Sequence, residues 1–446
     1  MIPRSDIEAL TAQPERELDP LDIILEQNKS RLPELVPVRH GRMTESPFTY
    51  YRGTAGAMAA DLSTTPNSGV MPMICGDAHI GNFGYFASPE RNLLFDLNDF
   101  DETGRGPFEW DLKRLIASVY LAAIDNGESE STATALAEKT SKYYRRTILK
   151  MNEQSALDRY YSRVNTDTFE ELVRKEYQPL FAKFEKKART RNSEQALHKF
   201  TVTDESGKNR RIVEQPPLTM RTDEITDEAL RELWMYYVYT ARPDIRYLLR
   251  NFKLKDHVLR VVGVGSVGTR CFIALLEDRL KNPLFLQIKE AQDTVLHTYG
   301  KIEQTSESLG FPDRPMGNGF RVVAGQRVMQ SQSDPFLGWI EGVPTRQGGT
   351  TDYYVRQFRD MKGSINLSAL DKEGLKQTAK VCSSLLARAH GQSRHIDDIA
   401  VFCEADKVFD ELMGKWAHDY AQLMVKDFQA MEEAIRRGRL PVQYAL

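Results

Sequence analysis

The pattern of hydrophobic and polar positions predicts helices toward both ends of the chain and short strands between them. Apolar residues recur at helical spacing in five segments. These segments are residues 109–126, 131–189, 227–251, 372–390 and 406–437. The first of them follows Gly106-Pro107, a pair that is typical of a helix start. Long helices therefore make up most of the predicted chain.

Short apolar runs bounded by turn residues predict the first strands. Residues 71–74 and 92–97 flank a polar loop in this way. Residues 200–213 read as a surface hairpin with Ser206-Gly207 at its tip. This hairpin belongs to a predicted helical insertion that covers about residues 131–227.

The middle of the chain has a different character, with strands close together. One predicted helix lies among five predicted strands. The strands are residues 257–264, 271–276, 284–289, 320–329 and 352–358, and the helix is residues 293–309. The predicted fold class is therefore α+β, with three parts. These parts are residues 1–250, a β-rich part at 251–360, and helices at 361–446 that complete the first part.

Composition and charge exclude several classes of protein. The 446 residues carry a net charge of −3, so no global field would attract nucleic acid or an anionic membrane. The four cysteines form no Cys-x-x-Cys pair, which argues against a zinc or disulfide framework. The N-terminus has no apolar core, and the apolar stretch at 116–124 is too short to span a bilayer. We therefore expect a cytoplasmic protein without nucleic-acid or membrane partners; its oligomeric state is left open.

Two polar loops carry the residues that phosphoryl transfer requires, namely a base for the attacking hydroxyl and ligands for metal ions. In protein kinases the base is an Asp followed five positions later by a metal-binding Asn, and Asp77 and Asn82 have this spacing. A second metal ligand should follow the next hairpin, where Asp99 stands, with Asp101 as an additional candidate. His79 either shapes the loop or contacts the substrate.

A glycine loop follows much later in the chain. Gly263, Gly265 and Gly268 form a Gly-x-Gly-x-x-Gly motif that also contains Ser266. A dinucleotide-binding turn would need a helix after the glycines, but residues 271–276 are rich in strand formers. Strand, glycine loop and strand is the arrangement of kinases, in which backbone amides cover the nucleotide phosphates.

A lysine on the third strand of such a kinase-type part grips the α- and β-phosphates, and Lys289 has this position. A helix glutamate normally steadies this lysine. Glu290, Glu303 and Glu307 are near it in the sequence, and none of them stands out as its partner.

Both halves of a kinase-type site are thus present in reversed order, which predicts a circularly permuted, two-lobed protein-kinase-like fold. In such a chain the helix that leads into the catalytic loop should stand at the C-terminus. Residues 375–390 fit this expectation, since they resemble the Leu-Ala-x-x-His helix of small-molecule kinases. The Gly106-Pro107-x-x-x-Asp111-Leu112 segment resembles that of aminoglycoside-phosphotransferase-like enzymes, in which the Asp braces the catalytic loop from below.

The full motif set resembles the uncharacterised bacterial domain-of-unknown-function family 2252. It comprises Arg39-His-Gly-Arg42-Met43, Phe48-x-x-x-Arg52-Gly53, Cys75-Gly-Asp-Ala-His79, Asn82-Phe83-Gly84, Phe95-Asp-Leu-Asn-Asp99-Phe-Asp-Glu102, Trp110-Asp-Leu-Lys-Arg114, Gly325-Gln-Arg327 and Arg356-Gln-x-Arg-Asp360-Met-Lys362. The family carries no established reaction. Its basic residues either hold an anionic substrate or form salt bridges between lobes.

The leading hypothesis is an ATP- and Mg²⁺-dependent phosphotransferase that acts on an unknown hydroxyl acceptor. Two alternatives keep the fold: transfer of AMP from a flipped nucleotide, and a pseudokinase that binds nucleotide without turnover. Gly76-Asp77-x-His79 also suggests a binuclear metallophosphoesterase. That chemistry needs Gly-Asn-His and His-x-His patterns, which this chain with eight histidines lacks.

Overall fold

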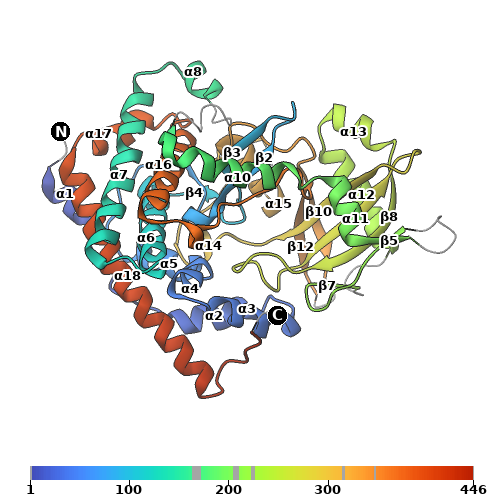
Figure 1. Cartoon of the computed structure of the whole chain (residues 1–446), viewed down its shortest axis with the longest axis horizontal. Coiled ribbons are helices and arrows are strands. Elements are labelled where there is room, and N and C mark those ends of the chain that lie inside the picture. The colour runs from blue at the N-terminus through green and yellow to red at the C-terminus, as the bar shows by residue number, and fades with distance from the viewer. Residues whose placement is uncertain are drawn as a thin grey trace.

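A computed structural model shows a helical part and a sheet part that lie side by side (Figure 1). The structure describes residues 3–162, 172–203, 210–221, 227–313, 317–345 and 348–444. The predicted α+β class is confirmed. Among the described residues, no helix is both long enough and apolar enough to cross a membrane.

Four long helices pack on one another to form the core of the helical part. They are α6 (Phe108–Asp125), α7 (Glu130–Asn152), α16 (Lys372–His390) and α18 (Lys407–Arg436). The short α17 (Ile396–Cys403) packs against α7. Segments from both ends of the chain therefore share one core, as the predicted helices at 372–390 and 406–437 required.

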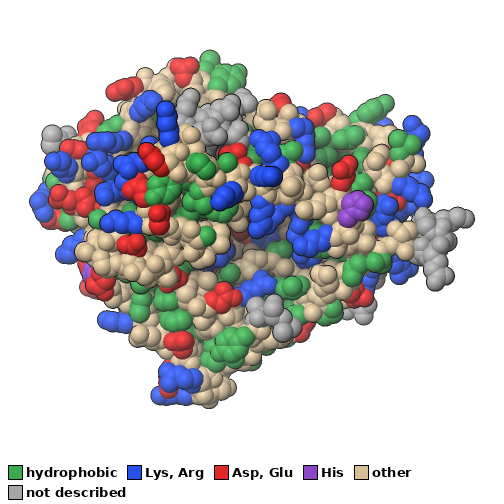
Figure 2. All heavy atoms as spheres, viewed as in Figure 1, with side chains coloured by type: hydrophobic (Ala, Val, Ile, Leu, Met, Phe, Trp, Pro, Cys, Tyr) green, Lys and Arg blue, Asp and Glu red, His purple; other side chains and the backbone are tan. Residues whose placement is uncertain are grey.

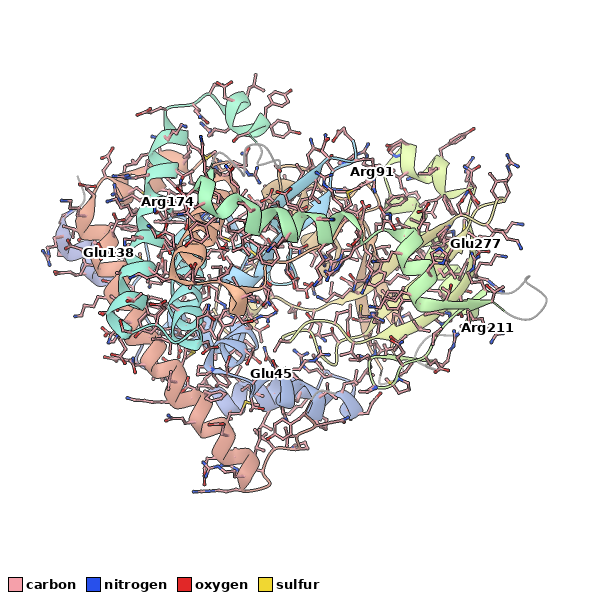
Figure 3. The ribbon with its side chains drawn as sticks, in the orientation of Figure 1. Glu45, Arg91, Glu138, Arg174, Arg211 and Glu277 are labelled. Atoms are coloured by element: carbon pink, nitrogen blue, oxygen red, sulfur yellow. The ribbon has the colours of Figure 1, made fainter. Side chains whose placement is uncertain are left out.

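Most helices from the N-terminal residues cover the lower side of this core, whereas α1 (Arg4–Leu10) lies at the left beside α18 (Figure 1). The others are α2 (Pro20–Asn28), α3 (Val36–Met43), α4 (Pro47–Arg52) and α5 (Ala55–Ser63). The last described residues return to them, since the Gln443 amide donates to the Pro37 carbonyl (2.9 Å). Glu45 marks the α3–α4 connection in Figure 3.

Helix α6 is buried on nearly every side, although it contains four charged residues in its first two turns. Buried charges are tolerated only when they are paired or hydrogen-bonded. Glu109 accepts from the Ser68 amide (2.8 Å) and hydroxyl (2.7 Å). Lys113 Nζ has no hydrogen-bond partner among the described residues and lies over the Trp416 ring (4.9 Å), and burial lowers its pKa to about 8. The other two, Asp111 and Arg114, hold a loop described below.

The sheet part is a six-stranded antiparallel sheet with the order β11-β12-β10-β9-β8-β7. The strands are β7 (Thr219–Met220), β8 (Lys253–Arg260), β9 (Cys271–Glu277), β10 (Pro283–Ala291), β11 (Gly338–Pro344) and β12 (Thr350–Gln357). Strand β7 joins the sheet through pairing of Thr219 with Arg260, so the sheet includes residues before the predicted start at 251.

Two predictions in this region were wrong. Residues 320–329 form a helix, α15 (Asn318–Met329), and not a strand. Helix α15 is buried on most sides and rich in valine, so its apolar run has no polar face that would reveal the helical period. The predicted helix at 293–309 is only α14 (Val295–Thr298), because Gly300 and the positive φ of Lys301 (57°) end it.

Other predicted elements are confirmed. Helices α8 (Ala156–Tyr161), α10 (Gln178–Arg189), α12 (Asp227–Thr240) and α13 (Pro243–Leu249) occur where helical spacing indicated them. Strands β5 (Thr201–Thr203) and β6 (Arg210–Ile212) pair as a hairpin; its predicted tip lies outside the described residues. Helix α11 (Ser193–Phe200) precedes this hairpin.

The segment with α10 and α11 crosses from the helical part to the sheet part (Figure 1). Helix α10 contacts β2 (Phe83–Ala87), and α11 contacts β10. The surface between the two parts is hollowed, and Lys and Arg side chains gather in the middle of this face (Figure 2). Loops from both parts meet in this hollow.

Candidate functional site at the junction of the two parts

The loop at residues 75–82 is held in place by helix α6. It follows β1 (Met73–Ile74), which pairs with β4 (Gly104–Arg105), and ends in a turn of 3-10 helix, η2 (Ile80–Asn82). Both oxygens of Asp111 accept backbone bonds from it, from Cys75 (2.6 Å) and Gly76 (2.9 Å). Asp111 thus braces the loop from below, as the resemblance to aminoglycoside-phosphotransferase-like enzymes implied.

The helix at residues 372–390 reaches the same place. His390, the last residue of α16, lies with Nε2 3.3 Å from Asp111 Oδ2 and with Nδ1 2.7 Å from the Tyr144 hydroxyl. A residue close to the C-terminus therefore supports a loop near residue 77.

Asp77 lies at the centre of the loop at residues 75–82, and its carboxylate faces the hollow. Arg114 Nε donates to Asp77 Oδ1 (2.7 Å), and Arg114 is itself fixed by the Tyr51 carbonyl (2.7 Å). Burial raises the pKa of Asp77 to about 6, against the opposing effect of Arg114. A carboxylate with this pKa is ionised at neutral pH and can accept a proton.

His79 shapes the loop and stays neutral. Its Nδ1 accepts from the Gly81 amide (3.1 Å), which assigns the ring proton to Nε2, 4.0 Å from Asp77 Oδ2. Burial, together with the charges of Arg52 and Arg114, holds the pKa of His79 well below its usual value. Of its two predicted roles, the geometry favours positioning of the loop.

The predicted metal ligands come from the two neighbouring loops of one hairpin. Strand β2 pairs with β3 (Leu93–Leu97), and the Asn98 amide donates to the Asn82 carbonyl (2.9 Å), which brings Asp99 next to Asn82. The Asn82 amide nitrogen donates to the Asp77 carbonyl (2.7 Å). Asp99 Oδ1 is buried and accepts no hydrogen bond from any residue that the structure describes.

These residues fit a magnesium ion that would share its ligands with a phosphate. Within the described ranges, no group of three or more His, Cys, Asp or Glu side chains is arranged to hold a metal by itself. Mg²⁺ in phosphoryl-transfer sites uses one or two protein ligands and completes its shell with phosphate oxygens and water. The unsatisfied oxygen of Asp99, beside the Asn82 amide, matches this requirement.

Lys289 on β10 is buried, and its partner is Asp101. Its ammonium contacts Asp101 Oδ2 and the Ser266 hydroxyl (2.9 Å), with Asp99 Oδ1 3.9 Å away. The Tyr354 hydroxyl donates to the other Asp101 oxygen (2.8 Å). Burial alone would lower the pKa of Lys289, but the Asp101 and Asp99 carboxylates raise it above the ordinary value.

The glutamates near Lys289 in sequence do not hold it. Glu290 accepts from the Arg270 amide (2.9 Å) on the opposite side of the strand. Glu303 and Glu307 line a separate cavity beside Arg105. The carboxylate that pairs with Lys289 is therefore Asp101, and not one of the three glutamates near it in sequence.

The glycine loop between β8 and β9 lies on the N-terminal helices. Arg42 donates to the Gly263 carbonyl, Gly268 accepts from the Leu32 amide (2.8 Å), and Gly265 lies against the Arg52 carbonyl. Gly263 and Gly268 have positive φ values of 69° and 91°, which disfavour any side chain there. Ser266, between these glycines, bonds to Lys289.

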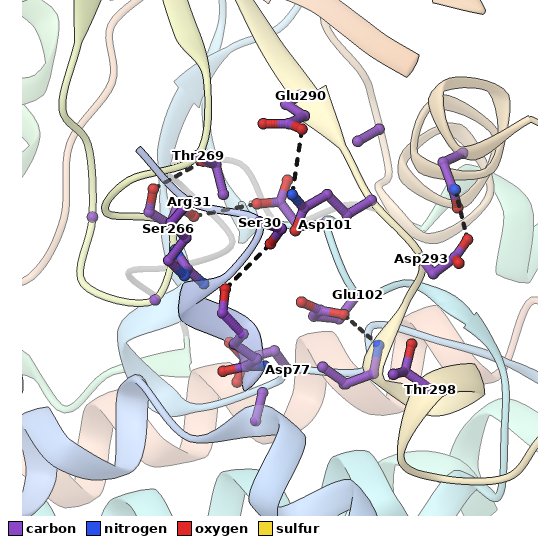
Figure 4. A pocket seen from close by; sticks show the side chains of 18 of the residues that line it. Ser30, Arg31, Asp77, Asp101, Glu102, Ser266, Thr269, Glu290, Asp293 and Thr298 are labelled. Atoms are coloured by element: carbon purple, nitrogen blue, oxygen red, sulfur yellow. Dashed lines mark hydrogen bonds between the residues drawn. The ribbon is translucent and has the colours of Figure 1, made fainter. Parts of the chain in front are cut away.

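These loops enclose one cavity of about 670 Å³ (Figure 4). It brings together most of the predicted site residues, namely Asp77, His79, Asn82, Asp99, Asp101, Gly263, Gly265 and Ser266. Lys289 does not line the cavity and contacts it through Asp101 and Ser266. Gly268 is not part of the lining either, and it packs against Arg31, which is. Figure 4 shows Asp77, Asp101 and Ser266 around the same space.

Two residues of the site had no predicted role: Arg114 and Tyr354. Arg114 lies one turn after Asp111 on α6, a spacing that places both on one helix face and was visible in the sequence. Tyr354 is directly opposite Lys289 in the β10–β12 register, which only the sheet reveals. Glu102 lines the cavity and accepts from the Val295 amide (2.7 Å); burial raises its pKa to about 7.

Comparison with known proteins gives one match. No curated protein and no solved structure matches the chain. One family model, described as uncharacterised protein conserved in bacteria (DUF2252), matches residues 31–434, and so spans both parts, the loops of Asp77 and Asp99, and the glycine loop. The chain therefore belongs to the DUF2252 family.

Proposed function

We propose that the protein is an ATP- and Mg²⁺-dependent phosphotransferase with a circularly permuted, two-lobed kinase-like fold. One observation carries the proposal: the loop of Asp77, the loop of Asp99, the glycine loop and Lys289 meet at a single cavity. Lys289 and Asp101 are 188 residues apart in sequence. Local sequence preferences alone do not explain such a convergence.

The topology of the sheet part supports the nucleotide-binding role. Its elements follow one another in the order expected of a kinase-type N-lobe. This order is β8, the glycine loop, β9, β10 with Lys289, helix α15, β11 and β12. The contact between His390 and Asp111 supports the permuted connection of the other lobe. Cavity and topology are independent observations that favour the same fold.

The proposed reaction uses the chain's own groups as follows. Asp77 takes the proton of the acceptor hydroxyl. The acceptor oxygen forms a bond to the γ-phosphorus of ATP, the bond from that phosphorus to the β-phosphate oxygen breaks, and ADP leaves. Asn82 and Asp99 would hold Mg²⁺, which neutralises phosphate charge. Lys289 would grip the phosphates, and the amides at Gly263 and Gly265 would cover them.

Calorimetric titration of ATP into the purified chain, with and without Mg²⁺, tests the proposal. We expect metal-dependent binding that Asp99→Ala and Lys289→Met both weaken. Lys253→Met is the matched control for the lysine variant, because Lys253 is an exposed lysine on β8 of the same sheet. Thermal melting of each variant identifies any loss of folding. A wild-type chain that binds no nucleotide would overturn the proposal.

The position of a radioactive label on ATP separates the alternatives once binding is found. Label transferred to an acceptor from the γ-phosphate supports phosphoryl transfer, and label transferred from the α-phosphate supports transfer of AMP. Nucleotide that binds but transfers no label across an acceptor screen supports the pseudokinase.

A further inference from the structure

A second cavity, of about 330 Å³, lies on the other side of the glycine loop from the cavity described above. Gly263 lines both cavities. The second cavity is bounded by the ends of β8 and β12, by residues 358–364 after β12, and by Arg191 after α10.

Five cationic side chains line this cavity, and none of them pairs with a carboxylate among the residues that the structure describes. They are Arg191, Arg260, Arg356, Arg359 and Lys362. Buried or half-buried cations are normally paired, because the lost hydration has to be replaced. Five unpaired cations in one cavity therefore point to an anionic ligand.

The contacts that these cations do make are neutral. Arg356 donates to the Gln287 side chain (2.8 Å), and Arg260 donates to the Thr219 hydroxyl (2.7 Å). Arg359 lies over the Phe200 ring (4.5 Å) and makes no hydrogen bond with any described residue. These bonds orient the guanidinium groups without neutralising them.

The two acids in the cavity wall have other partners. Asp360 forms an ion pair with Arg91 (2.5 Å), which lies in the β2–β3 turn (Figure 3). Asp334 accepts from the backbone amides of Gln357 (2.5 Å) and Phe336 (2.8 Å), and burial raises its pKa to about 6. Neither acid balances the five cations, so the cavity keeps an excess of positive charge.

The segment that carries Arg359 and Lys362 is held rigidly. Arg359 and Met361 have positive φ values of 55° and 52°, a conformation that non-glycine residues rarely adopt. Backbone bonds fix the segment at three points: Phe358 to Phe285 (2.9 Å), Met361 to Arg191 (2.8 Å) and Gly363 to Tyr85 (3.0 Å). Strain retained in this way is typical of positions that bind a ligand.

The charges of the cavity also disfavour one another. Burial, followed by the charge of Arg356, lowers the pKa of Lys362 to about 7. Burial, followed by the charges of Arg260 and Arg191, lowers the pKa of Arg359 to about 10. A bound anion would remove both penalties.

We propose that this cavity binds the phosphate groups of a phosphorylated ligand, held by Arg356, Arg359 and Lys362. Planar guanidinium groups and an ammonium are the side chains that recognise phosphate oxygens most directly. Arg356 also reaches the Asn98 carbonyl (3.4 Å), one residue before Asp99, so the phosphates would lie beside the metal loop. This inference rests on the proposed nucleotide-dependent function.

The phosphate has two chemical sources. If it is the tail of ATP, the β- and γ-phosphates lie in this cavity and the α-phosphorus is exposed to the acceptor. The acceptor oxygen then bonds to that phosphorus, the bond to the β-phosphate oxygen breaks, pyrophosphate leaves, and Asp77 takes the proton. If it belongs to the acceptor, ATP occupies the first cavity and the acceptor is itself a phosphorylated compound.

Titration of the full chain with inorganic tripolyphosphate tests the proposal. We expect binding that Lys362→Met and Arg359→Gln each weaken roughly tenfold, because each removes one charge-assisted hydrogen bond. Lys187→Met, at an exposed position of α10, is the matched control and should leave the affinity unchanged. No binding to the wild type, or equal affinity in the variants and the control, would overturn the proposal.

Parallel titrations with ATP and with adenosine identify the source of the phosphate. ATP affinity that falls in both cavity variants, with adenosine unaffected, assigns the cavity to the nucleotide tail. ATP affinity that is unchanged while tripolyphosphate binding falls assigns it to a phosphorylated acceptor.

The two proposals fail separately. If Asp99→Ala abolishes Mg²⁺-dependent ATP binding and the cavity variants bind tripolyphosphate like the wild type, only the phosphate cavity is wrong. If tripolyphosphate binding depends on the cavity but ATP never binds, only the nucleotide-dependent function is wrong.

Discussion

Asp77 is a carboxylate whose ionisation depends on the charges that surround it. Burial raises its pKa to about 6, and Arg114 and Arg52 oppose this rise. Since only the ionised carboxylate accepts a proton, we expect the transfer rate to fall as the pH drops through about 6, while nucleotide affinity changes little. A pH–rate profile measures the midpoint.

A variant sharpens this prediction. Arg52→Gln removes a nearby positive charge and should move the midpoint to higher pH, whereas Arg146→Gln, at an exposed position of α7, should leave it in place. A midpoint that stays the same in Arg52→Gln would argue against Asp77 as the group that titrates.

Gly76, directly before Asp77, is required by the shape of the loop. Its φ is +77°, and a Cβ at this position would lie 2.1 Å from the Glu102 carbonyl oxygen. We expect Gly76→Ala to lower the free energy of unfolding by more than about 2 kcal/mol, since backbone strain and a backbone clash add. Urea denaturation measures the loss.

Gly127 provides the control for this substitution. Its φ is +85°, but a Cβ there would meet no atom within 4 Å. Gly127→Ala should therefore cost only the conformational strain of about 1 kcal/mol. Equal losses in both variants would contradict the assigned clash with Glu102.

At the level of elements, helix α15 connects the sheet part to the metal loop through Arg321. This fully buried side chain donates to the backbone carbonyls of Asp101 (2.9 Å), Thr103 (2.5 Å) and Gln292 (2.7 Å). Arg321→Met should lower the free energy of unfolding by about 3 kcal/mol, because three buried carbonyls lose their donors. Hydrogen exchange should accelerate at residues 99–105.

Arg327 on the same helix allows a matched comparison. Its guanidinium donates to the Leu337 carbonyl (2.8 Å), away from the metal loop. Arg327→Met should leave exchange at residues 99–105 unchanged. Accelerated exchange in both variants would mean that α15 stabilises the sheet part in general and does not clamp this loop.

The elements also show what the sequence could and could not predict. The proximity of Asp77, Asn82 and Asp99 was predictable, because it depends on spacing within one short segment. The role of Asp101 was not, because its contact with Lys289 depends on how β10 packs against the metal loop. Helix α15 was misread as a strand because a helix that is buried on most sides loses its amphipathic pattern.

At the level of the whole molecule, the chain order is separable from the arrangement in space. Segments far apart in sequence pack together, as α16 and α18 do on α6 and α7, as α1 does on α18, and as Gln443 does on Pro37. A rearranged chain can be made that begins at Asn251 and ends at Arg250, with a flexible Gly/Ser linker between Tyr444 and Pro3. We expect this chain to fold and to melt cooperatively.

A second rearranged chain serves as the control. Opened between Ala117 and Ser118, in the buried middle of α6, it should not fold, because the new charged termini would lie in the core. Circular dichroism and thermal melting compare the two chains. Failure of both would mean that the native connection at residues 250–251 is itself needed for folding.

The contact of Lys289 with Asp101 and Ser266 has a consequence for selectivity. In the free protein Lys289 is already paired with the Asp101 carboxylate. The binding free energy of a phosphate at Lys289 is therefore only the difference between the attraction of Lys289 to the phosphate and its attraction to Asp101. Uncharged compounds cannot displace the carboxylate, and weakly charged ones gain little by doing so. Once it loses Lys289, Asp101 would keep the hydroxyl groups of Tyr354 (2.8 Å) and Ser266 (3.3 Å) as hydrogen-bond donors. The chain thus carries an internal competitor, which multiply charged ligands displace best.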